Sequence, residues 1–171
     1  MAQNDSQTMT DAFTLGVSPS HLLHRAQQYA AVQSATALQK AGITLRQFSV
    51  LAAVAEKEGT SQSRLVDETG IDRATLADMV SRMERAGHIR RAASKEDARA
   101  KAVFLTAKGK KALSTAAPAV KDADEQLLAA LPKNRRNAFL AILATFSDNA
   151  DRTILNLEAD EFGVKQKSKP G

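Results

Sequence analysis

The 171-residue chain contains no cysteine and no tryptophan, and only 4% of its residues are aromatic. Without cysteine it can form no disulfide, no thiolate zinc site and no cysteine-based oxidation sensor. It also lacks any run of about 18 apolar residues, so we expect no membrane-spanning segment. A secretory signal begins with basic residues that are followed by an apolar run, and the N-terminal stretch MAQNDSQTMTDAF lacks this pattern. We therefore expect a cytoplasmic protein.

Catalytic signatures are missing too. The sequence has no glycine-rich phosphate loop, no nucleophile elbow and no cluster of metal ligands. His21 and His24 are three residues apart, but no nearby carboxylate or cysteine completes a metal-binding set. The third histidine, His88, stands alone in the sequence. We therefore expect a protein that is not an enzyme and that holds no metal and no cofactor.

Positive charge is concentrated in one third of the chain. The net charge is +5, and residues 60–111 alone contain 12 Lys or Arg against 7 Asp or Glu, which accounts for the whole excess. A localised basic field suits an anionic partner, and nucleic acid is the commonest one. The alternative from charge alone is a well-solvated surface.

Two amphipathic helices are predicted near the N-terminus. The first begins at Ser18-Pro19-Ser20, with proline in its first turn, and ends at Gly42. Its apolar residues are Leu22, Ala26, Tyr29 and Leu38. Thr44 and Gln47 have the spacing of a capping box and begin the second helix, which ends at Gly59. The apolar stripe of the second helix is Phe48, Leu51 and Ala55, beside Val50 and Val54.

A helix-turn-helix follows. Ser61 is suited to cap a short third helix, Gly70 to end it in the left-handed conformation, and Asp72 to cap the fourth helix, residues 73–86. A three-residue turn containing glycine between two helices is typical of this motif. The buried stripe of the fourth helix is predicted to be Leu76, Met79, Val80 and Met83.

After Gly87 the pattern changes to two short strands, residues 88–93 and 102–106, joined by the charged tip SKEDARAK. The predicted fold is mainly α with a small β-hairpin wing, that is, a winged helix-turn-helix. A helix at 107–130, with a kink or brief break at Pro118, and a last helix from Pro132 complete the chain.

The terminal helices carry more apolar surface than a monomer of this layout could cover, which indicates a homodimer. Their apolar residues in the C-terminal part include Leu127, Leu128, Leu131, Phe139, Ile142, Leu143, Phe146, Ile154 and Leu155. We predict a flexible segment at 1–17, a dimerisation region at 18–42 and 107–158, a DNA-binding lobe at 43–106 and a flexible basic tail at 159–171.

The fourth helix fits the major groove of double-stranded DNA, where short Ala74 and Ala77 allow close approach. The start of the third helix could hold a phosphate, and Arg99 at the wing tip suits the minor groove. Asp78 either accepts a hydrogen bond from cytosine or repels phosphates. The predicted DNA-binding residues are Ser61, Gln62, Ser63, Arg73, Ala74, Thr75, Ala77, Asp78, Arg82, Lys95, Arg99 and Lys101.

The stretch from Asp97-Ala98-Arg99 through Leu105-Thr106 to Gly109 matches the pattern D-x-R-x5-L-T-x2-G, and the chain resembles the MarR family of bacterial transcriptional regulators. Arg82, Gly87 and Arg91 also fall at the positions the family pattern gives them. The resemblance implies an obligate homodimer in the bacterial cytoplasm, associated with the nucleoid. It also implies that Arg99 enters the minor groove while Asp97 supports the wing. Many members carry a second arginine where this chain has Ala98.

The resemblance further implies a repressor, released from a pseudo-palindromic operator when a small ligand binds between the dimer layer and the DNA-binding lobe. An aromatic carboxylate or its coenzyme A thioester fits the basic and polar side chains that are candidates for this site. These candidates are His21, His24, Arg25, Gln28 and Arg46. The same side chains could instead be caps, solvated residues or dimer salt bridges. The competing function is a DNA-binding regulator or architectural factor without a small-molecule effector.

Overall fold

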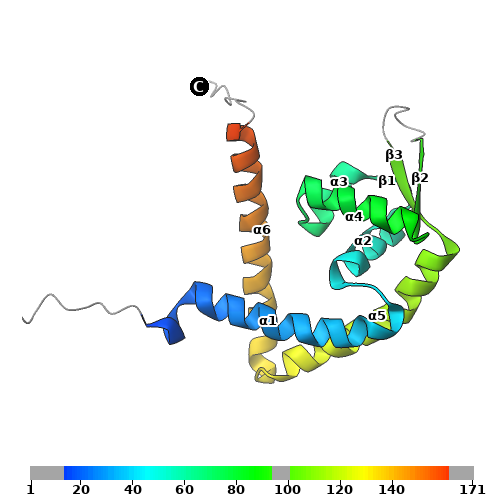
Figure 1. Ribbon diagram of the computed structural model, residues 1–171. Coiled ribbons are helices and arrows are strands. Elements are labelled where there is room, and N and C mark those ends of the chain that lie inside the picture. Colours follow the sequence, from blue (N-terminus) through cyan, green and yellow to red (C-terminus); the bar gives the residue numbers. More distant parts are fainter. Residues whose placement is uncertain (1–13, 94–100, 162–171) are drawn as a thin grey trace, which may run out of the picture.

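The computed structural model describes residues 14–93 and 101–161, with side chains up to residue 150. Helices and one small sheet make up this part of the chain (Figure 1). In order, the elements are η1 (Leu15–Val17), α1 (Pro19–Leu38), η2 (Gln39–Ala41), α2 (Leu45–Glu56), β1 (Thr60–Ser61), α3 (Gln62–Thr69), α4 (Arg73–Arg85), β2 (Ile89–Ala93), β3 (Lys101–Leu105), α5 (Ala107–Ala129), η3 (Lys133–Arg135) and α6 (Arg136–Glu161).

Helix-capping side chains place the helix starts where the sequence predicts them. The Ser18 hydroxyl accepts the His21 N–H at 3.5 Å, and proline occupies the first turn of α1. At the start of α2, Thr44 accepts the Gln47 N–H at 3.3 Å while the Gln47 side chain accepts the Thr44 N–H at 2.9 Å. This reciprocal capping box satisfies two backbone donors that the helix itself leaves unpaired.

The helix-turn-helix is confirmed residue by residue. Ser61 caps α3 by accepting the Arg64 N–H at 3.2 Å, and Gly70 ends the helix at a φ of 63°. Asp72 then caps α4 by accepting the Thr75 N–H at 2.9 Å. The buried residues of α4 are the predicted stripe: Leu76, Met79, Val80 and Met83.

The wing is part of a three-stranded antiparallel sheet in the order β1-β3-β2. The hairpin of β2 and β3 is confirmed, whereas β1 was not expected, because two residues are too short for a period-two pattern. Thr60 pairs with Val103, and the Gly59 N–H donates to the Val103 carbonyl at 2.9 Å. The tip, residues 94–100, lies outside the described residues.

The junction between the wing and α5 accounts for the L-T-x2-G part of the motif. The Thr106 hydroxyl accepts the Gly109 N–H at 3.0 Å and lies 2.6 Å from the Gly87 carbonyl oxygen, to which it donates. A Cβ atom at position 109 would lie 2.0 Å from the His88 carbonyl oxygen. Only glycine therefore allows α5 to approach the start of the wing this closely.

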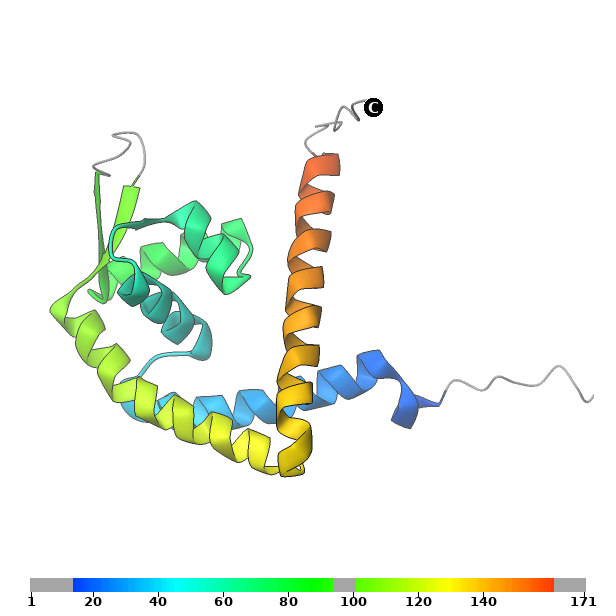
Figure 2. The same ribbon diagram turned by 180° about the vertical axis from the view of Figure 1, so that it is seen from behind.

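Helix α5 continues through Pro118 as one helix, so the expected disturbance is a bend and not a break (Figures 1 and 2). The predicted apolar stripes of α1 and α2 differ in how far the single chain buries them. Of the four apolar residues predicted for α1, only Leu38 is buried, because the start of α1 extends past the part of the molecule that covers its end. In α2, Val50, Leu51 and Val54 are buried as the sequence indicates, whereas Ala55 is exposed and Ala53 is buried in addition.

The hydrophobic core joins α2, α3, α4 and the sheet to the adjoining parts of α1 and α5. Helix α6 stands apart from this lobe and rises beside it in both views (Figures 1 and 2). Its apolar side chains Leu140, Ile142, Leu143 and Phe146 are 38–55% exposed. On α1, Leu22, Leu23, Tyr29 and Val32 are 43–64% exposed. The terminal helices thus present large apolar residues that the described part of a single chain leaves uncovered.

Candidate nucleic-acid interface and adjoining cleft

The outer face of α4 combines small and charged side chains. Ala74 and Ala77 are exposed near its start, and Arg82 and Arg85 near its end. Buried residues occupy the opposite side, so the core fixes which face α4 presents to solvent. A face that is small at one end and cationic at the other can approach a phosphate-lined groove closely. Arg73 and Asp78 share this exposed face, and Thr75 is half-buried at its edge.

A hollow of about 150 Å³ joins the starts of α3 and α4. Gln62, Ser63, Arg73 and Ala77 line it, so the fold brings together residues that the sequence predicts for DNA binding. The Gln62 amide nitrogen is buried and has no hydrogen-bond partner among the described residues. The Ser61 hydroxyl is already used as a helix cap, which leaves backbone N–H groups and Ser63 for an anion at this helix start.

Asp78 and Arg82 form an ion pair along α4. The carboxylate Oδ2 and the guanidinium Nη2 are 3.0 Å apart, and the two side chains are 63% and 59% exposed. The pair has the i, i+4 spacing that brings side chains together on one side of a helix. In the free protein the positive charge of Arg82 therefore neutralises the negative charge of Asp78 on the exposed face of α4.

Glu84 links α4 to the wing. Its Oε1 accepts the Arg91 backbone N–H at 2.9 Å, and its Oε2 accepts the Arg91 Nε–H at 2.8 Å and a further bond from Nη2. Hydrogen bonds from Arg91 hold the pKa of Glu84 below its usual value, and the same bonds raise the pKa of Arg91. Sequence reasoning missed Glu84, because a contact seven residues apart across a turn has no local signature.

Within the wing, Lys101 is exposed at the start of β3. Arg90 lies over the Phe104 ring with its guanidinium carbon 4.3 Å from the ring centroid, which stiffens the sheet through a cation–π contact. Lys95, Asp97 and Arg99, the other predicted wing residues, lie outside the described residues. Their roles stay predictions.

A larger cleft of about 560 Å³ lies between α1, the start of α2 and α4. Its charged lining residues are two arginines, Arg46 and Arg82, and none of the carboxylates in the described part of the chain lines it. The rest of the lining is polar or apolar: Gln27, Ala31, Ser34, Ala35, Ile43, Thr44, Leu45, Gln47, Thr75 and Met79. Two arginines in a lining that also includes apolar side chains suit a small molecule that has an anionic group and a hydrophobic body.

Of the predicted ligand-binding residues, only Arg46 lines this cleft in the single chain. His24 and Gln28 are hydrogen-bonded to each other at 3.1 Å on the exposed side of α1. His21 and Arg25 are likewise not among the lining residues. The sequence singled out neither Gln27 nor Arg82 as a cleft residue, because which side of a helix meets another helix is decided by packing.

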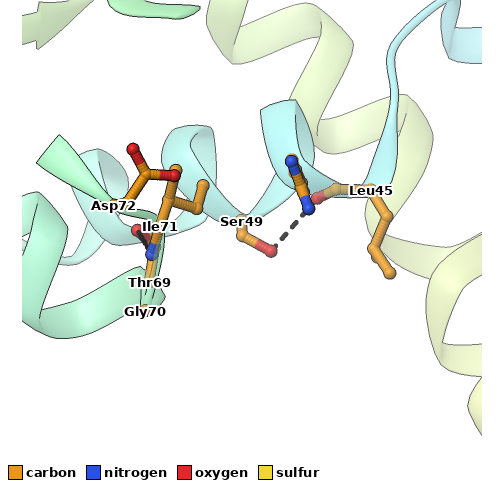
Figure 3. Close-up of a pocket in the computed structure, with 7 residues that line it drawn as sticks. Leu45, Ser49, Thr69, Gly70, Ile71 and Asp72 are labelled. Atoms are coloured by element: carbon orange, nitrogen blue, oxygen red, sulfur yellow. Dashed lines mark hydrogen bonds between the residues drawn. The ribbon is translucent and has the colours of Figure 1, made fainter. Parts of the chain in front are cut away.

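A second hollow of about 220 Å³ lies at the turn of the helix-turn-helix, and it shares Leu45 and Arg46 with the larger cleft (Figure 3). Asp72 lies at its edge. Hydrogen bonds from Thr75 lower the pKa of Asp72, and the Arg46 charge adds a smaller effect in the same direction. Arg46 therefore lines both the hollow at the turn that leads into α4 and the larger cleft.

Comparison with known proteins identifies the chain. The sequence model of the MarR family matches residues 41–100, which span the helix-turn-helix and most of the wing. The transcriptional regulator HosA of Escherichia coli is 36% identical over 101 residues, 59% of this chain and 75% of HosA. This chain belongs to the MarR family.

Solved structures of MarR-like regulators agree with the fold. The PcaV regulator of Streptomyces coelicolor, in complex with its natural ligand, superposes with a TM-score of 0.75 at 27% identity over 81% of this chain and 98% of PcaV. The repressor CouR, bound to a 23-mer DNA duplex, gives a TM-score of 0.72 at 28% identity over 78% and 94%. CouR of Rhodococcus jostii has also been solved with p-coumaroyl-CoA, at 24% identity.

As a MarR family member, the chain is a DNA-binding transcriptional regulator with a winged helix fold. HosA and PcaV are transcriptional regulators, and CouR is a transcriptional repressor. Among the described residues, no helix combines the length and apolarity needed to cross a membrane. The same residues contain no group of three or more His, Asp or Glu side chains arranged to hold a metal ion.

Proposed function

We propose that this MarR family protein is a homodimeric repressor, active in the bacterial cytoplasm, that leaves a pseudo-palindromic operator when a small anionic aromatic molecule binds. One observation carries the proposal. Helix α4 presents a small and cationic face to solvent, while its flank, through Thr75, Met79 and Arg82, lines a cleft with a second arginine. One rigid helix therefore belongs both to the DNA-binding face and to the ligand site.

DNA binding is assigned to α4 in the major groove, with phosphates held at the start of α3. The exposed Ala74 and Ala77 permit close approach, and Arg73 lies beside the hollow formed with Gln62 and Ser63. Arg99 and Lys95, with Lys101, are assigned to the DNA backbone or minor groove, and Asp97 to wing support. CouR, similar in fold and sequence, is a repressor that has been solved on DNA.

DNA affinity and its salt dependence test this assignment. Fluorescence anisotropy with duplex DNA from beside the gene should show tight binding that weakens steeply between 50 and 300 mM salt, because phosphate contacts release counterions, roughly 0.9 per contact. Arg99→Ala and Arg73→Gln should each weaken binding, whereas Lys121→Gln, an exposed change on α5, should not. Salt-independent binding, or unchanged affinity in both arginine variants, would remove the DNA-binding assignment.

The homodimer is proposed from the exposed apolar side chains of the terminal helices. Phe139, Ile142, Leu143 and Phe146 recur at helical spacing on one side of α6, which leaves Asn137 on the other. Sedimentation should show a dimer for the wild type and a monomer for Phe146→Asp, because a carboxylate cannot be buried there without a partner. Asn137→Asp, with the same charge change, should remain dimeric. A dimeric Phe146→Asp protein would contradict this interface.

The ligand is proposed to bind in the 560 Å³ cleft, a volume within the usual range for small-molecule sites. Arg46 is assigned to the anionic group, and an aromatic carboxylate or its coenzyme A thioester fits the apolar remainder. PcaV and CouR have been solved with small molecules bound. His21, His24, Arg25 and Gln28 stay candidates, now for contacts made in the dimer.

A regulator without an effector is the alternative. Thermal unfolding with benzoate and benzoyl-CoA separates the two functions, because a ligand that binds only the folded protein raises its melting temperature. We expect stabilisation of the wild type and a smaller shift for Arg46→Gln. Equal melting temperatures with and without both compounds would favour the alternative.

A further inference from the structure

Arg82 lies on the border between the DNA-binding face and the cleft. Successive residues of an α-helix turn by about 100°, so Thr75, Met79 and Arg82 share one flank of α4, and all three line the cleft. Asp78 lies one turn before Arg82 and closer to the exposed face that carries Ala74 and Arg85. The Arg82 guanidinium is therefore within reach of two surfaces, and in the free protein it is paired with Asp78 at 3.0 Å.

We propose that the ligand acts by competing with Asp78 for Arg82. The proposal rests on the function given above and names how the cleft regulates DNA binding. An anion in the cleft takes the Arg82 guanidinium as a hydrogen-bonding partner, together with Arg46. The Asp78 carboxylate then remains without a cation on the face of α4 that meets DNA.

The balance of interactions favours this exchange. The Asp78–Arg82 pair is 63% and 59% exposed, and exposed pairs of this kind stabilise a helix only weakly. The cleft offers the same anion a second guanidinium, that of Arg46. Hydrogen bonds between guanidinium and carboxylate are roughly twice as strong as neutral ones. A carboxylate held by both guanidinium groups therefore makes more of these bonds than Asp78 makes with Arg82 alone.

The released carboxylate opposes DNA binding. While paired, Asp78 and Arg82 have a combined charge of zero on the exposed face of α4. After the exchange, Asp78 faces a duplex that carries one negative charge per about 1.7 Å of helix axis. In the cleft lining, Arg82 is the one charged residue that α4 contributes, so it is the direct electrostatic link between ligand and DNA.

Asp78→Asn tests the exchange, since it removes the competing carboxylate and leaves the cleft intact. With benzoate or benzoyl-CoA as the probe, we expect the wild type to lose about tenfold in DNA affinity, a typical coupling. Without ligand, Asp78→Asn should bind DNA more tightly than the wild type, because Arg82 no longer has an acid to neutralise. With ligand it should lose only about threefold or less. Benzamide, which is neutral, should release neither protein.

Ligand binding measured by calorimetry without DNA provides a second readout. Asp78→Asn should bind the probe about twofold more tightly, because Arg82 is no longer shared. Arg82→Gln should bind it more weakly. Asp67→Asn, an exposed acid on α3, is the matched charge control and should behave as the wild type in both measurements.

The outcomes separate the inference from the function. If benzoate or benzoyl-CoA releases the wild type and Asp78→Asn to the same extent, the exchange is wrong while the ligand-released repressor stands. If neither compound weakens DNA binding by the wild type, the exchange and the ligand response both fail. If the wild type binds no DNA from beside its gene, the proposed function itself fails.

Discussion

The Glu84 carboxylate binds both the backbone N–H and the guanidinium of Arg91, with Oε1 to N at 2.9 Å and Oε2 to Nε at 2.8 Å. The last turn of α4 is thus tied to the middle of β2. The orientation of the wing relative to α4 is set by this contact together with the turn at Gly87. A protein that reads two grooves at once needs that orientation fixed before it meets DNA.

Replacement of Glu84 by glutamine should lower the free energy of unfolding by about 1–2 kcal/mol, because charge-assisted hydrogen bonds become neutral ones. Urea denaturation measures this difference. Asp78→Asn, which removes the exposed pair on the same helix, should cost roughly 0.5 kcal/mol or less. Equal losses in the two variants would show that the Glu84–Arg91 contact adds no more than a surface pair. DNA affinity of Glu84→Gln should also fall as the wing loosens.

The stability that Glu84 contributes should depend on pH in a defined direction. Arg91 lowers the pKa of Glu84 from its ordinary value of about 4.5, so the contribution is complete above pH 4.5 and is lost as the pH falls through the lower value. The stability difference between the wild type and Glu84→Gln should therefore be constant near neutrality and shrink in acid. A difference that grows as the pH falls would contradict this assignment.

Gly109→Ala should destabilise the protein by about 2–3 kcal/mol, since the new Cβ would lie 2.0 Å from the His88 carbonyl oxygen and must displace α5 or the wing. The direction of this change in stability is informative, because replacing a glycine inside a helix by alanine otherwise stabilises a protein by roughly 0.5–1 kcal/mol. Gly16→Ala, where the new Cβ meets no atom within 4 Å, is the control. The melting temperatures of both variants measure this effect. A Gly109→Ala protein more stable than the wild type would disprove the close approach of α5 to the His88 carbonyl group.

His88 should make the protein less stable in mild acid. Burial, with a smaller effect from Lys108, lowers the pKa of His88 below its ordinary value of 6.5. Below about pH 6.5 the unfolded chain binds a proton that folded His88 does not, so stability falls with pH until the lower pKa is passed. Unfolding measured from pH 7.5 to 5 should show a steeper decline for the wild type than for His88→Gln. Parallel declines would show that another group is responsible.

Ala74→Leu should weaken DNA binding strongly while changing stability by roughly 0.5 kcal/mol or less, as is usual for exposed positions. Ala74 is exposed on the side of α4 opposite the core, so a larger side chain there prevents close approach to the groove. Ala55→Leu, an exposed change on α2, should leave DNA affinity unchanged. Fluorescence anisotropy gives both affinities, and wild-type binding by Ala74→Leu would place this face away from DNA.

Much of the fold follows from local sequence. The caps at Thr44, Ser61 and Asp72 lie where short-range spacing predicts them. The buried stripe of α4 also appears as predicted. Both features are local, because helical periodicity and the capping of a helix start act over three or four residues. The lining of the cleft in a single chain follows from the sequence only at Arg46, whereas Gln27 and Arg82 were not expected there. The role of the histidines stays a prediction.

The sequence by itself determined which segments are helices, where the turn and wing begin, and which face of α4 is buried, since each depends on hydrogen bonds or apolar spacing within a few neighbouring residues. Only the tertiary structure decided that Thr60–Ser61 adds a third strand, that Glu84 binds Arg91 and that Arg82 borders the cleft. Those contacts join residues on different elements. Their partners are selected when the shared core brings the elements together, and no spacing along the chain records that choice.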